Sequence, residues 1–174
     1  MADAPLITRY GNPVLHRTAQ PVERFDDELV ALAERMRASM AAADGVGVAG
    51  PQIGVGLRVF VIDCPGPDGE NVVATLVNPV LEVSEERELD ESEEGCLSVP
   101  GVWNVVPRPA WAAVSGFDEF GKPVRVEGTG LLARCLQHEY DHLDGIVYVD
   151  RLPKRTRRKL LDAMGTPEWG EPPA

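Results

Sequence analysis

The chain has 174 residues, of which 44% are hydrophobic and 26% are charged, and its formal net charge at pH 7 is −11. This length and composition are typical of one globular domain with a full hydrophobic core. The negative charge argues against DNA binding by the main body. No apolar run reaches the roughly 18 residues that a membrane span requires, so we expect no membrane association.

The N-terminus and the cysteines indicate a compartment. Residues 1–5 lack the basic and apolar segments of a signal peptide. The three cysteines, Cys64, Cys96 and Cys135, are odd in number and have no CxxC spacing, which argues against a disulfide framework. We therefore expect a reducing, cytoplasmic location.

The first half of the chain contains one predicted helix followed mainly by strands. Apolar residues recur at helical spacing through 27–43, and Asp26 is a suitable N-cap for that helix. The other predicted segments are an irregular N-terminal stretch (6–21), a glycine-rich loop (45–56), a buried strand (57–63), a turn (64–69), strands at 72–83 and 85–90 with a break at Asn78-Pro79, and a short connection at 94–100.

The second half is predicted to hold a hairpin and two helices. The hairpin comprises 110–117 and 123–127. A helix follows Thr129 and ends at Asp144-Gly145. After it come a short extended segment (148–152), a basic helix (153–164) and a proline-rich tail (165–174) that we expect to be disordered. The pattern favours an α+β fold with antiparallel sheets packed around the central helix, in a single catalytic domain of residues 1–164.

Charged residues gather in two places. Residues 82–94 contain eight acids and one base, Arg87, whereas five of the six residues in 154–159 are basic. A charge run of this kind is usually a solvated face, and we expect that for the acidic run.

The central helix carries the pattern H-E-x-x-H. One helical turn separates His138 from His142, so both imidazoles can reach one metal ion, and Glu139 can reach water on that ion. The alternative is a pair of partly exposed surface histidines. The apolar neighbours Leu132 and Leu136 argue against it, since they indicate that the histidines point inward, where they need a partner.

The third ligand separates classes of metalloprotein. Tyr148 stands where one class of zinc protease has a third histidine, and Glu168 and Glu171 lie in the predicted tail. His16 has no motif around it, which leaves Cys96. One cysteine and two histidines leave a coordination position open, as a catalytic metal requires. The alternative for Cys96 is a buried small hydrophobic residue, the fate we expect for Cys64 and Cys135.

Three segments together carry a family resemblance. Residues 45–52 (GVGVAGPQ), 94–98 (EGCLS) and 137–142 (QHEYDH) resemble, in this order, the signature motifs of the peptide deformylases, and the likeness extends over about residues 6–152. It implies removal of the formyl group from N-terminal formylmethionine of nascent polypeptides, with release of formate. It also implies one divalent metal ion, Fe²⁺ first, with Zn²⁺, Ni²⁺ or Co²⁺ as alternatives. The chain departs from the family pattern at Gly50, where alanine is usual, and at Trp103 and Arg134, which concern the substrate rim. The glycine loosens the backbone but leaves Gln52 in place.

The residues indicate metal-assisted amide hydrolysis. A metal ion lowers the pKa of bound water from about 16 toward about 7, supplying hydroxide for the attack. Glu139 would accept the proton and deliver it to the leaving amine as general acid/base. The resemblance assigns stabilisation of the developing negative charge to the side-chain amide of Gln52 and the backbone N–H of Leu97.

The methionine side chain requires an apolar pocket. We expect Val46, Leu97, Leu132 and Cys135 to line it, with main-chain groups around Gly47 pairing with the extended peptide. Residues 45–50 also satisfy GxGxxG. A dinucleotide site is nevertheless excluded, because a helix precedes this loop and a strand follows it, the reverse of the required order.

Two further hypotheses and three rival functions remain. Arg108 is expected to pair with Asp141 and steady the helix that carries the ligands. The basic helix, with residues 154–159, is expected to contact ribosomal RNA. The rivals are an endopeptidase, which needs a different third ligand, a structural metal module, which needs a fourth ligand, and a relative without activity.

Overall fold

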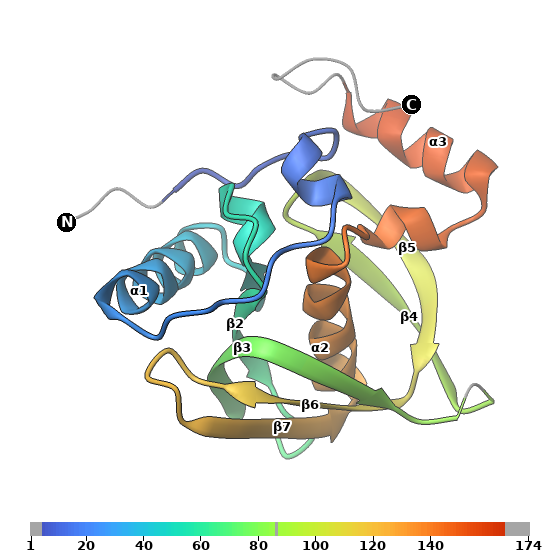
Figure 1. The fold of residues 1–174 in the computed structure, drawn as a ribbon. Coiled ribbons are helices and arrows are strands. Elements are labelled where there is room, and N and C mark those ends of the chain that lie inside the picture. The colour runs from blue at the N-terminus through green and yellow to red at the C-terminus, as the bar shows by residue number, and fades with distance from the viewer. Residues whose placement is uncertain (1–4, 86, 166–174) are drawn as a thin grey trace.

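The computed structural model describes residues 5–85 and 87–165 of the chain (Figure 1). In chain order the elements are η1 (Pro13–His16), α1 (Asp27–Ala42), β1 (Gly47–Ala49), η2 (Gly50–Ile53), β2 (Val59–Pro65), β3 (Asn71–Val83), β4 (Leu89–Cys96), β5 (Val99–Pro109), β6 (Trp111–Phe117), β7 (Pro123–Thr129), α2 (Gly130–Leu143), η3 (Tyr148–Arg151) and α3 (Lys154–Met164), where η marks a 3-10 helix. The predicted α+β class is confirmed, with antiparallel sheets around the central α2.

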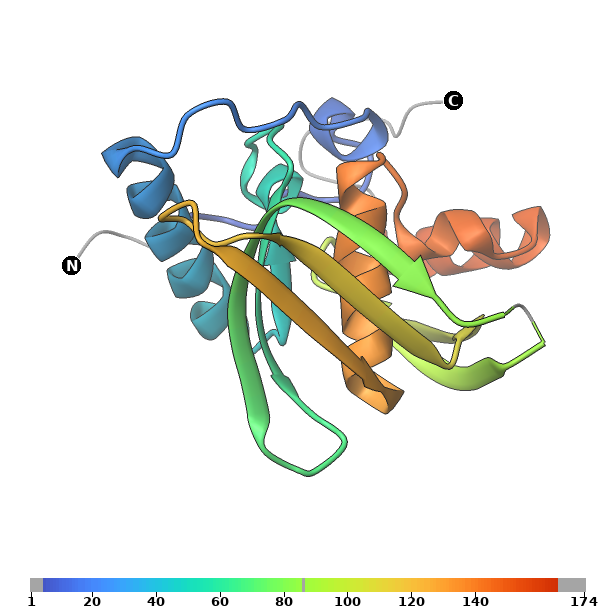
Figure 2. The same cartoon turned by 60° about the horizontal axis from the view of Figure 1, so that its bottom comes forward.

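Five strands form one antiparallel sheet in the order β1-β2-β3-β6-β7, and Figure 2 shows its strands crossing in front of α2. Successive side chains of a strand point to opposite faces. Phe60 and Ile62 of β2 pack in the cluster that includes α2, whereas Val59 and Val61 pack in the cluster that includes α1. Both faces of β2 are therefore covered, which explains the continuous apolar run that predicted a buried strand.

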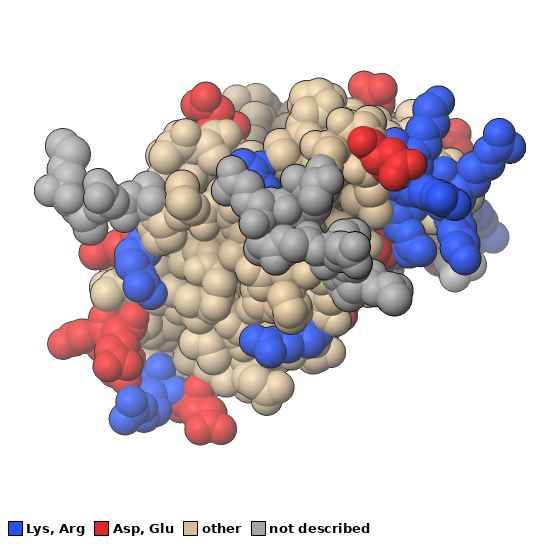
Figure 3. All heavy atoms as spheres, turned by 90° about the horizontal axis from the view of Figure 1, so that it is seen from above, with Lys and Arg blue, Asp and Glu red and all other residues tan. Residues whose placement is uncertain are grey.

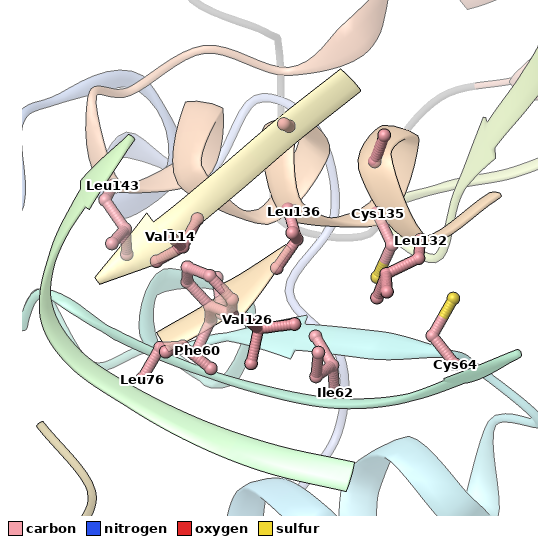
Figure 4. Packing of buried hydrophobic residues seen from close by; sticks show 13 residues of the cluster. Phe60, Ile62, Cys64, Leu76, Val114, Val126, Leu132, Cys135, Leu136 and Leu143 are labelled. Carbon is pink, nitrogen blue, oxygen red and sulfur yellow. The ribbon is translucent and has the colours of Figure 1, made fainter. Parts of the chain in front are cut away.

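The main core lies between this sheet and α2 (Figure 4). Leu132, Leu136 and Leu143 of α2 are buried there against Phe60 and Val114. Burial of each such side chain contributes about 1.5–3 kcal/mol. The apolar face of α2 thus fixes the helix on the sheet, and its opposite face can carry polar groups.

The first helix, α1, agrees with its prediction. The Asp26 carboxylate accepts from the N–H of Leu29 at 3.2 Å, and Asp27 and Glu28 follow in the first turn, where acids complement the helix dipole. The helix ends at Ala42, close to the predicted stop at Asp44-Gly45.

The β4–β5 hairpin is a separate two-stranded sheet, and two predictions here were wrong. In the expected strand at 85–90, Arg87 and Glu88 are turn and bend, and β4 begins only at Leu89. The expected connection at 94–100 consists of strand ends, with Cys96 paired to Val99 across a tight turn. β5 was not predicted because it contains prolines 100, 107 and 109. Proline argues against a central strand but is tolerated in a strand at a sheet edge.

The predicted break at Asn78-Pro79 is a bulge inside a continuous β3. Asn78 has a φ of 49°, and the pairing with β6 shifts register between Val77 and Val80. Its side-chain amide accepts from Val22 N at 2.8 Å and donates to Val22 O at 2.9 Å. The bulge therefore ties the N-terminal segment to the sheet.

The glycine-rich loop, the segment at 148–152, the basic helix and the tail remain to be compared with their predictions. The glycine-rich loop at 45–56 includes β1 and η2, and the extended segment at 148–152 is instead the 3-10 turn η3, in which Asp150 accepts from Val147 N at 2.9 Å. The basic helix α3 is confirmed. The tail predicted at 165–174 lies outside the described residues except for Gly165, so it stays a prediction, as does the single domain. No helix in the described ranges is long and apolar enough to cross a membrane.

Candidate metal centre and active site

α2 and the end of β4 bring together the three predicted metal ligands. The ligand atoms of Cys96, His138 and His142 all lie within 4.8 Å of one another, and Cys96 Sγ is 3.5 Å from His142 Nε2. Both histidines are buried and Cys96 is half-buried. Because one turn of helix separates the histidines, their rings lie side by side, with centroids 5.0 Å apart.

Glu94 orients the first histidine. Nδ1 of His138 donates to Glu94 Oε2 at 2.7 Å, which leaves Nε2 of the same ring as the atom available to a metal ion. Burial disfavours charge on His138, but the Cys96 sulfur and the Glu94 carboxylate outweigh it and raise the pKa of His138 well above its ordinary value. Burial, together with the charge of His138, lowers the pKa of His142 far below its ordinary value, which keeps that ring neutral.

This donor set fits a divalent metal ion. A cysteine sulfur and two imidazoles suit zinc and ferrous iron and leave one coordination position open. His142 Nδ1 is buried and has no hydrogen-bond partner among the described residues, so no hydrogen bond to that nitrogen fixes the orientation of the ring. A bound ion would compensate the burial of these polar groups.

Glu139 lies beside the cluster with one oxygen unpaired. It is buried, and its Oε2 has no partner within the described part of the chain. Burial raises the pKa of Glu139 to about 7. A side chain at Gly47 would place its Cβ 2.8 Å from Glu139 Oε1, so glycine at this position lets the carboxylate lie against β1. The result is a proton acceptor poised near neutral pH.

Gln52 and Leu97 approach the cluster from η2 and from the β4–β5 turn. Gln52 Oε1 accepts from Ala49 N at 2.9 Å, and this bond fixes the amide so that Nε2 faces Ser98 Oγ at 3.3 Å and Cys96 Sγ at 3.6 Å. Leu97 is half-buried, and its carbonyl accepts from Arg9 Nη1 at 3.3 Å. Both residues line the same cavity as the ligands.

The cavity has a volume of about 590 Å³, a size typical of small-molecule sites. Val46, Leu97 and Cys135, three of the four residues expected at the methionine pocket, line it, and so do Gly47 and Leu131. Leu132 does not: it is 1% exposed and packs in the sheet core, because it points to the other side of α2.

The free cysteines agree with their predicted places. Cys64 and Cys135 are buried in the apolar cluster beneath the helix, and Figure 4 shows both sulfurs there. Cys135 also reaches the cavity wall, and its Sγ lies 3.7 Å from the carbonyl of Val46.

Glu94 is the functional residue that sequence reasoning missed. It belongs to the acidic run expected to be solvated, yet it is 6% exposed and receives Nε and Nη2 of Arg108, at 2.7 Å each. Burial acts to raise the pKa of Glu94, but the hydrogen bonds from Arg108 and His138 outweigh it and hold the pKa far below its ordinary value. One signal was available: Glu94 stands only two residues before the predicted ligand Cys96, which brings its backbone close to the site.

The predicted pair of Arg108 and Asp141 is present. Arg108 Nη1 donates to Asp141 Oδ2 at 2.9 Å, and both side chains are buried. Arg151, the last residue of η3, also donates to both Asp141 oxygens, at 2.6 and 2.7 Å. Asp141 thus links the ligand helix to the hairpin and to the C-terminal segment.

The three departures from the family pattern lie in different surroundings. Trp103 is 62% exposed and lines the cavity, as expected of a rim residue. Gly50 is closely packed, since a Cβ there would meet the carbonyl oxygens of Val55 and Leu57 at 2.8 and 2.9 Å. Arg134 lines the cavity but is only 5% exposed and bonds to Glu94, so the expectation of a rim residue was wrong for it.

The fold and the site together define a candidate metal-dependent hydrolase, with a cysteine and two histidines as ligands and a buried carboxylate beside them. Residues 5–158 match the family model described as polypeptide deformylase. The chain belongs to this family, the enzymes that remove the N-terminal formyl group from nascent polypeptides.

Relatives and solved structures agree with this assignment. Peptide deformylase 1 of Streptomyces avermitilis is 49% identical over 164 residues, which are 93% of this chain and 76% of that protein. The peptide deformylase of Acidothermus cellulolyticus is 48% identical over 163 residues, covering 94% and 87% of the two chains. The crystal structure of peptide deformylase from Ehrlichia chaffeensis in complex with actinonin superposes with a TM-score of 0.86 at 33% identity, covering 92% of this chain and 95% of that one.

Proposed function

We propose that this chain hydrolyses the formyl amide of N-terminal formylmethionine on nascent polypeptides and releases formate. The observation that carries the proposal is the cluster of Cys96, His138 and His142 in a cavity of about 590 Å³. The buried carboxylate of Glu139 lies beside it, and its Oε2 has no hydrogen-bond partner in the described part of the chain. The family match supports the same reaction.

Cys96, His138 and His142 would hold one divalent metal ion. When bound, such an ion supplies Lewis-acid chemistry: it acidifies water and polarises a carbonyl. We propose ferrous iron as the resident ion, with zinc, nickel and cobalt as functional substitutes, because thiolate and imidazole donors accept each of them.

Glu139 is proposed as the general acid/base. Its raised pKa, about 7, suits a group that takes a proton from water at neutral pH and returns it to the leaving amine. Burial of the carboxylate, which excludes competing water, supports both transfers. The position of Gly47 against Glu139 keeps the carboxylate on the substrate side of α2.

Gln52 and Leu97 are proposed to stabilise the negative charge that develops on the formyl oxygen. The bond from Ala49 N to Gln52 Oε1 directs the amide donor toward the ligand cluster. Such a preorganised donor is worth more than a mobile one. The backbone N–H of Leu97 would supply the second donor from the β4–β5 turn.

Substrate binding is proposed along β1. β1 is an edge strand of the five-stranded sheet, and an edge strand has a row of backbone groups that an extended peptide can pair with. Main-chain groups around Gly47 would pair with the peptide, and Val46, Leu97 and Cys135 would contact the methionine side chain. Leu132 supports this wall only indirectly, from the core.

We also propose a cytoplasmic location and a ribosome contact through α3. The helix has Lys154, Arg155, Arg158 and Lys159 exposed, and Figure 3 shows basic side chains gathered over α3 on an otherwise mixed surface. Basic side chains that contact phosphates bind in a salt-dependent way. Co-sedimentation with ribosomes should weaken with salt and disappear on truncation after Pro153, and co-sedimentation that survives truncation would refute the contact.

The reaction is tested by formate release. Protein purified without oxygen and loaded with Fe²⁺ should release formate from a formyl-Met peptide, whereas Glu139→Ala should not. The same protein should leave internal peptide bonds intact, which separates it from an endopeptidase. Absence of formate from the parent protein would overturn the proposal.

A further inference from the structure

Arg134 occupies a place on α2 that the reaction does not itself explain. It stands one helical turn before His138, on the same side of the helix, and is 5% exposed. A buried guanidinium needs acceptors for its donors. Each of the acceptors that Arg134 finds belongs to the β4–β5 hairpin.

The guanidinium reaches both strands of that hairpin. Nη1 donates to Glu94 Oε1 at 2.9 Å and to the carbonyl of Val106 at 2.7 Å. Nη2 donates to the carbonyl of Asp90 at 3.0 Å, with the Asp90 carboxylate at 3.3 Å. Two of these acceptors are backbone carbonyls, so Arg134 fixes the backbone of both strands as well as the Glu94 side chain.

The hairpin and α2 together supply the metal ligands. Cys96 ends β4, and His138 and His142 lie on α2, so the distance between the two elements sets the geometry of the cluster. A side chain that joins the two elements therefore acts on the position of the ligands.

Glu94 receives donors on both oxygens, and Arg134 binds the one that His138 does not use. Oε2 accepts from His138 Nδ1 and from Arg108 Nη2, while Oε1 accepts from Arg108 Nε and from Arg134 Nη1. With Oε1 held from two sides, the plane of the carboxylate cannot rotate freely, and Oε2 stays aimed at His138. Second partners of this kind fix the orientation of a ligand ring.

We propose that Arg134 is a positioning residue of the metal centre: by bonding Glu94, Val106 and Asp90 at once, it fixes the hairpin to α2 and holds the carboxylate that orients His138. This inference rests on the proposed metal site. The function requires the planar, two-armed guanidinium, because a lysine ammonium cannot span three acceptors on two strands.

The test measures metal binding and turnover separately. Metal-free protein is titrated with Co²⁺ against a chromophoric chelator, and the Co²⁺ absorption spectrum reports the thiolate and imidazole geometry. Arg134→Met should weaken Co²⁺ binding by about 10-fold or more, the lower end of the range for such outer partners, and alter the spectrum. In the Fe²⁺-loaded protein kcat should fall by a similar factor, while KM for a formyl-Met peptide changes by less than about 3-fold.

Two further variants complete the design. Arg134→Lys keeps the charge and is expected to fold even if the methionine variant does not, and it should still bind Co²⁺ several-fold more weakly than the parent. Arg125→Met is the matched control, because Arg125 is an exposed arginine that bonds Glu82 and Glu127 away from the cavity, and its removal should leave Co²⁺ affinity unchanged.

The outcomes are separable. Parent-like Co²⁺ affinity and spectrum in both Arg134 variants would overturn the proposal, and so would a loss confined to the thermal midpoint of the metal-free protein. Full recovery by lysine would also overturn it, since charge alone would then suffice. Co²⁺ binding is measured without substrate. A parent protein that releases no formate would therefore overturn the proposed function, while the Co²⁺ titration would still test the role of Arg134.

Discussion

The helices α1 and α2 pack on the same sheet and have similar lengths, 16 and 14 residues, but they bury different kinds of side chain. α1 buries an apolar stripe that includes Leu32, Met36 and Met40, with its other side in water. α2 is buried almost all round, and its buried residues include Arg134, Gln137, His138, Glu139, Asp141 and His142. An apolar stripe is sufficient to hold a helix, whereas a buried polar face needs partners from elsewhere.

The partners of α2 come mainly from the hairpin, and they leave two atoms unpaired. Glu94 and Arg108 satisfy His138 and Asp141. Glu139 Oε2 and His142 Nδ1 have no hydrogen-bond partner among the described residues, and both belong to α2. Native structures contain few such groups, and each calls for an explanation. The contrast teaches that changes on α2 should affect chemistry, and changes on α1 should affect stability.

The strongest test of the contrast is Glu139→Gln. The amide keeps the shape of the side chain but cannot accept a proton, so kcat for formate release should fall by about 10²–10⁴-fold. The thermal midpoint should stay level or rise, because a buried carboxylate has been removed. Glu34→Gln, at an exposed site on α1, is the control and should leave both kcat and the thermal midpoint unchanged. A Glu139→Gln variant that loses stability but keeps the kcat of the parent would contradict the contrast between α1 and α2.

Gln52→Leu should have the next largest effect. The variant loses the donor that faces the ligand cluster, so kcat should fall by about 10²–10³-fold while metal content stays unchanged. Steady-state formate release and metal analysis of the same sample check both statements. Gln20→Leu, at an exposed position, should match the parent. Parent-like kcat in Gln52→Leu would remove Gln52 from the reaction.

On α1, Met36→Ala should lower the free energy of unfolding and leave kcat almost unchanged. Met36 is fully buried against the sheet, and such truncations cost about 2–5 kcal/mol. Urea unfolding should show this loss, while kcat at a temperature well below the midpoint stays within about 2-fold of the parent. A selective fall in kcat in a folded variant would show that α1 also shapes the site.

The smallest expected effect concerns pH. Burial lowers the pKa of His16, whose Nε2 accepts from Gly11 N at 2.9 Å. The unfolded chain then binds this proton at a higher pH than the folded chain, so the contribution of His16 to stability is complete above about 6.5 and declines as the pH falls below it. The free energy of unfolding, measured from pH 7.5 to 5, should therefore fall less in His16→Gln than in the parent. Equal slopes would contradict this.

Local patterns predicted the elements whose side chains follow one period. The stripe of α1, the run of β2 and the HExxH pattern on α2 each repeat at the spacing of their element, and the structure has all three. The ligand group of Cys96, His138 and His142 followed from elimination and from the family motifs, and the structure brings these atoms together.

What could not be predicted depends on contacts between distant segments. Glu94 resembles its acidic neighbours in sequence, and only the contacts with Arg108 and His138 distinguish it from them. β5 contains prolines that local rules exclude from a strand, but an isolated two-stranded sheet leaves room for them. Leu132 and Cys135 both belong to the core cluster, and only the rotation of α2 decides that Cys135 also reaches the cavity whereas Leu132 does not.

The separation of the ligands along the chain has a consequence for the order of folding. Cys96 is 46 residues from His142, and Glu94 is 44 residues from His138. Because closing loops of this length costs chain entropy, we expect these contacts to form late in folding, after the hairpin and the helix. An ion present during refolding would then stabilise the native state more than the transition state. It should slow unfolding and leave the folding rate almost unchanged.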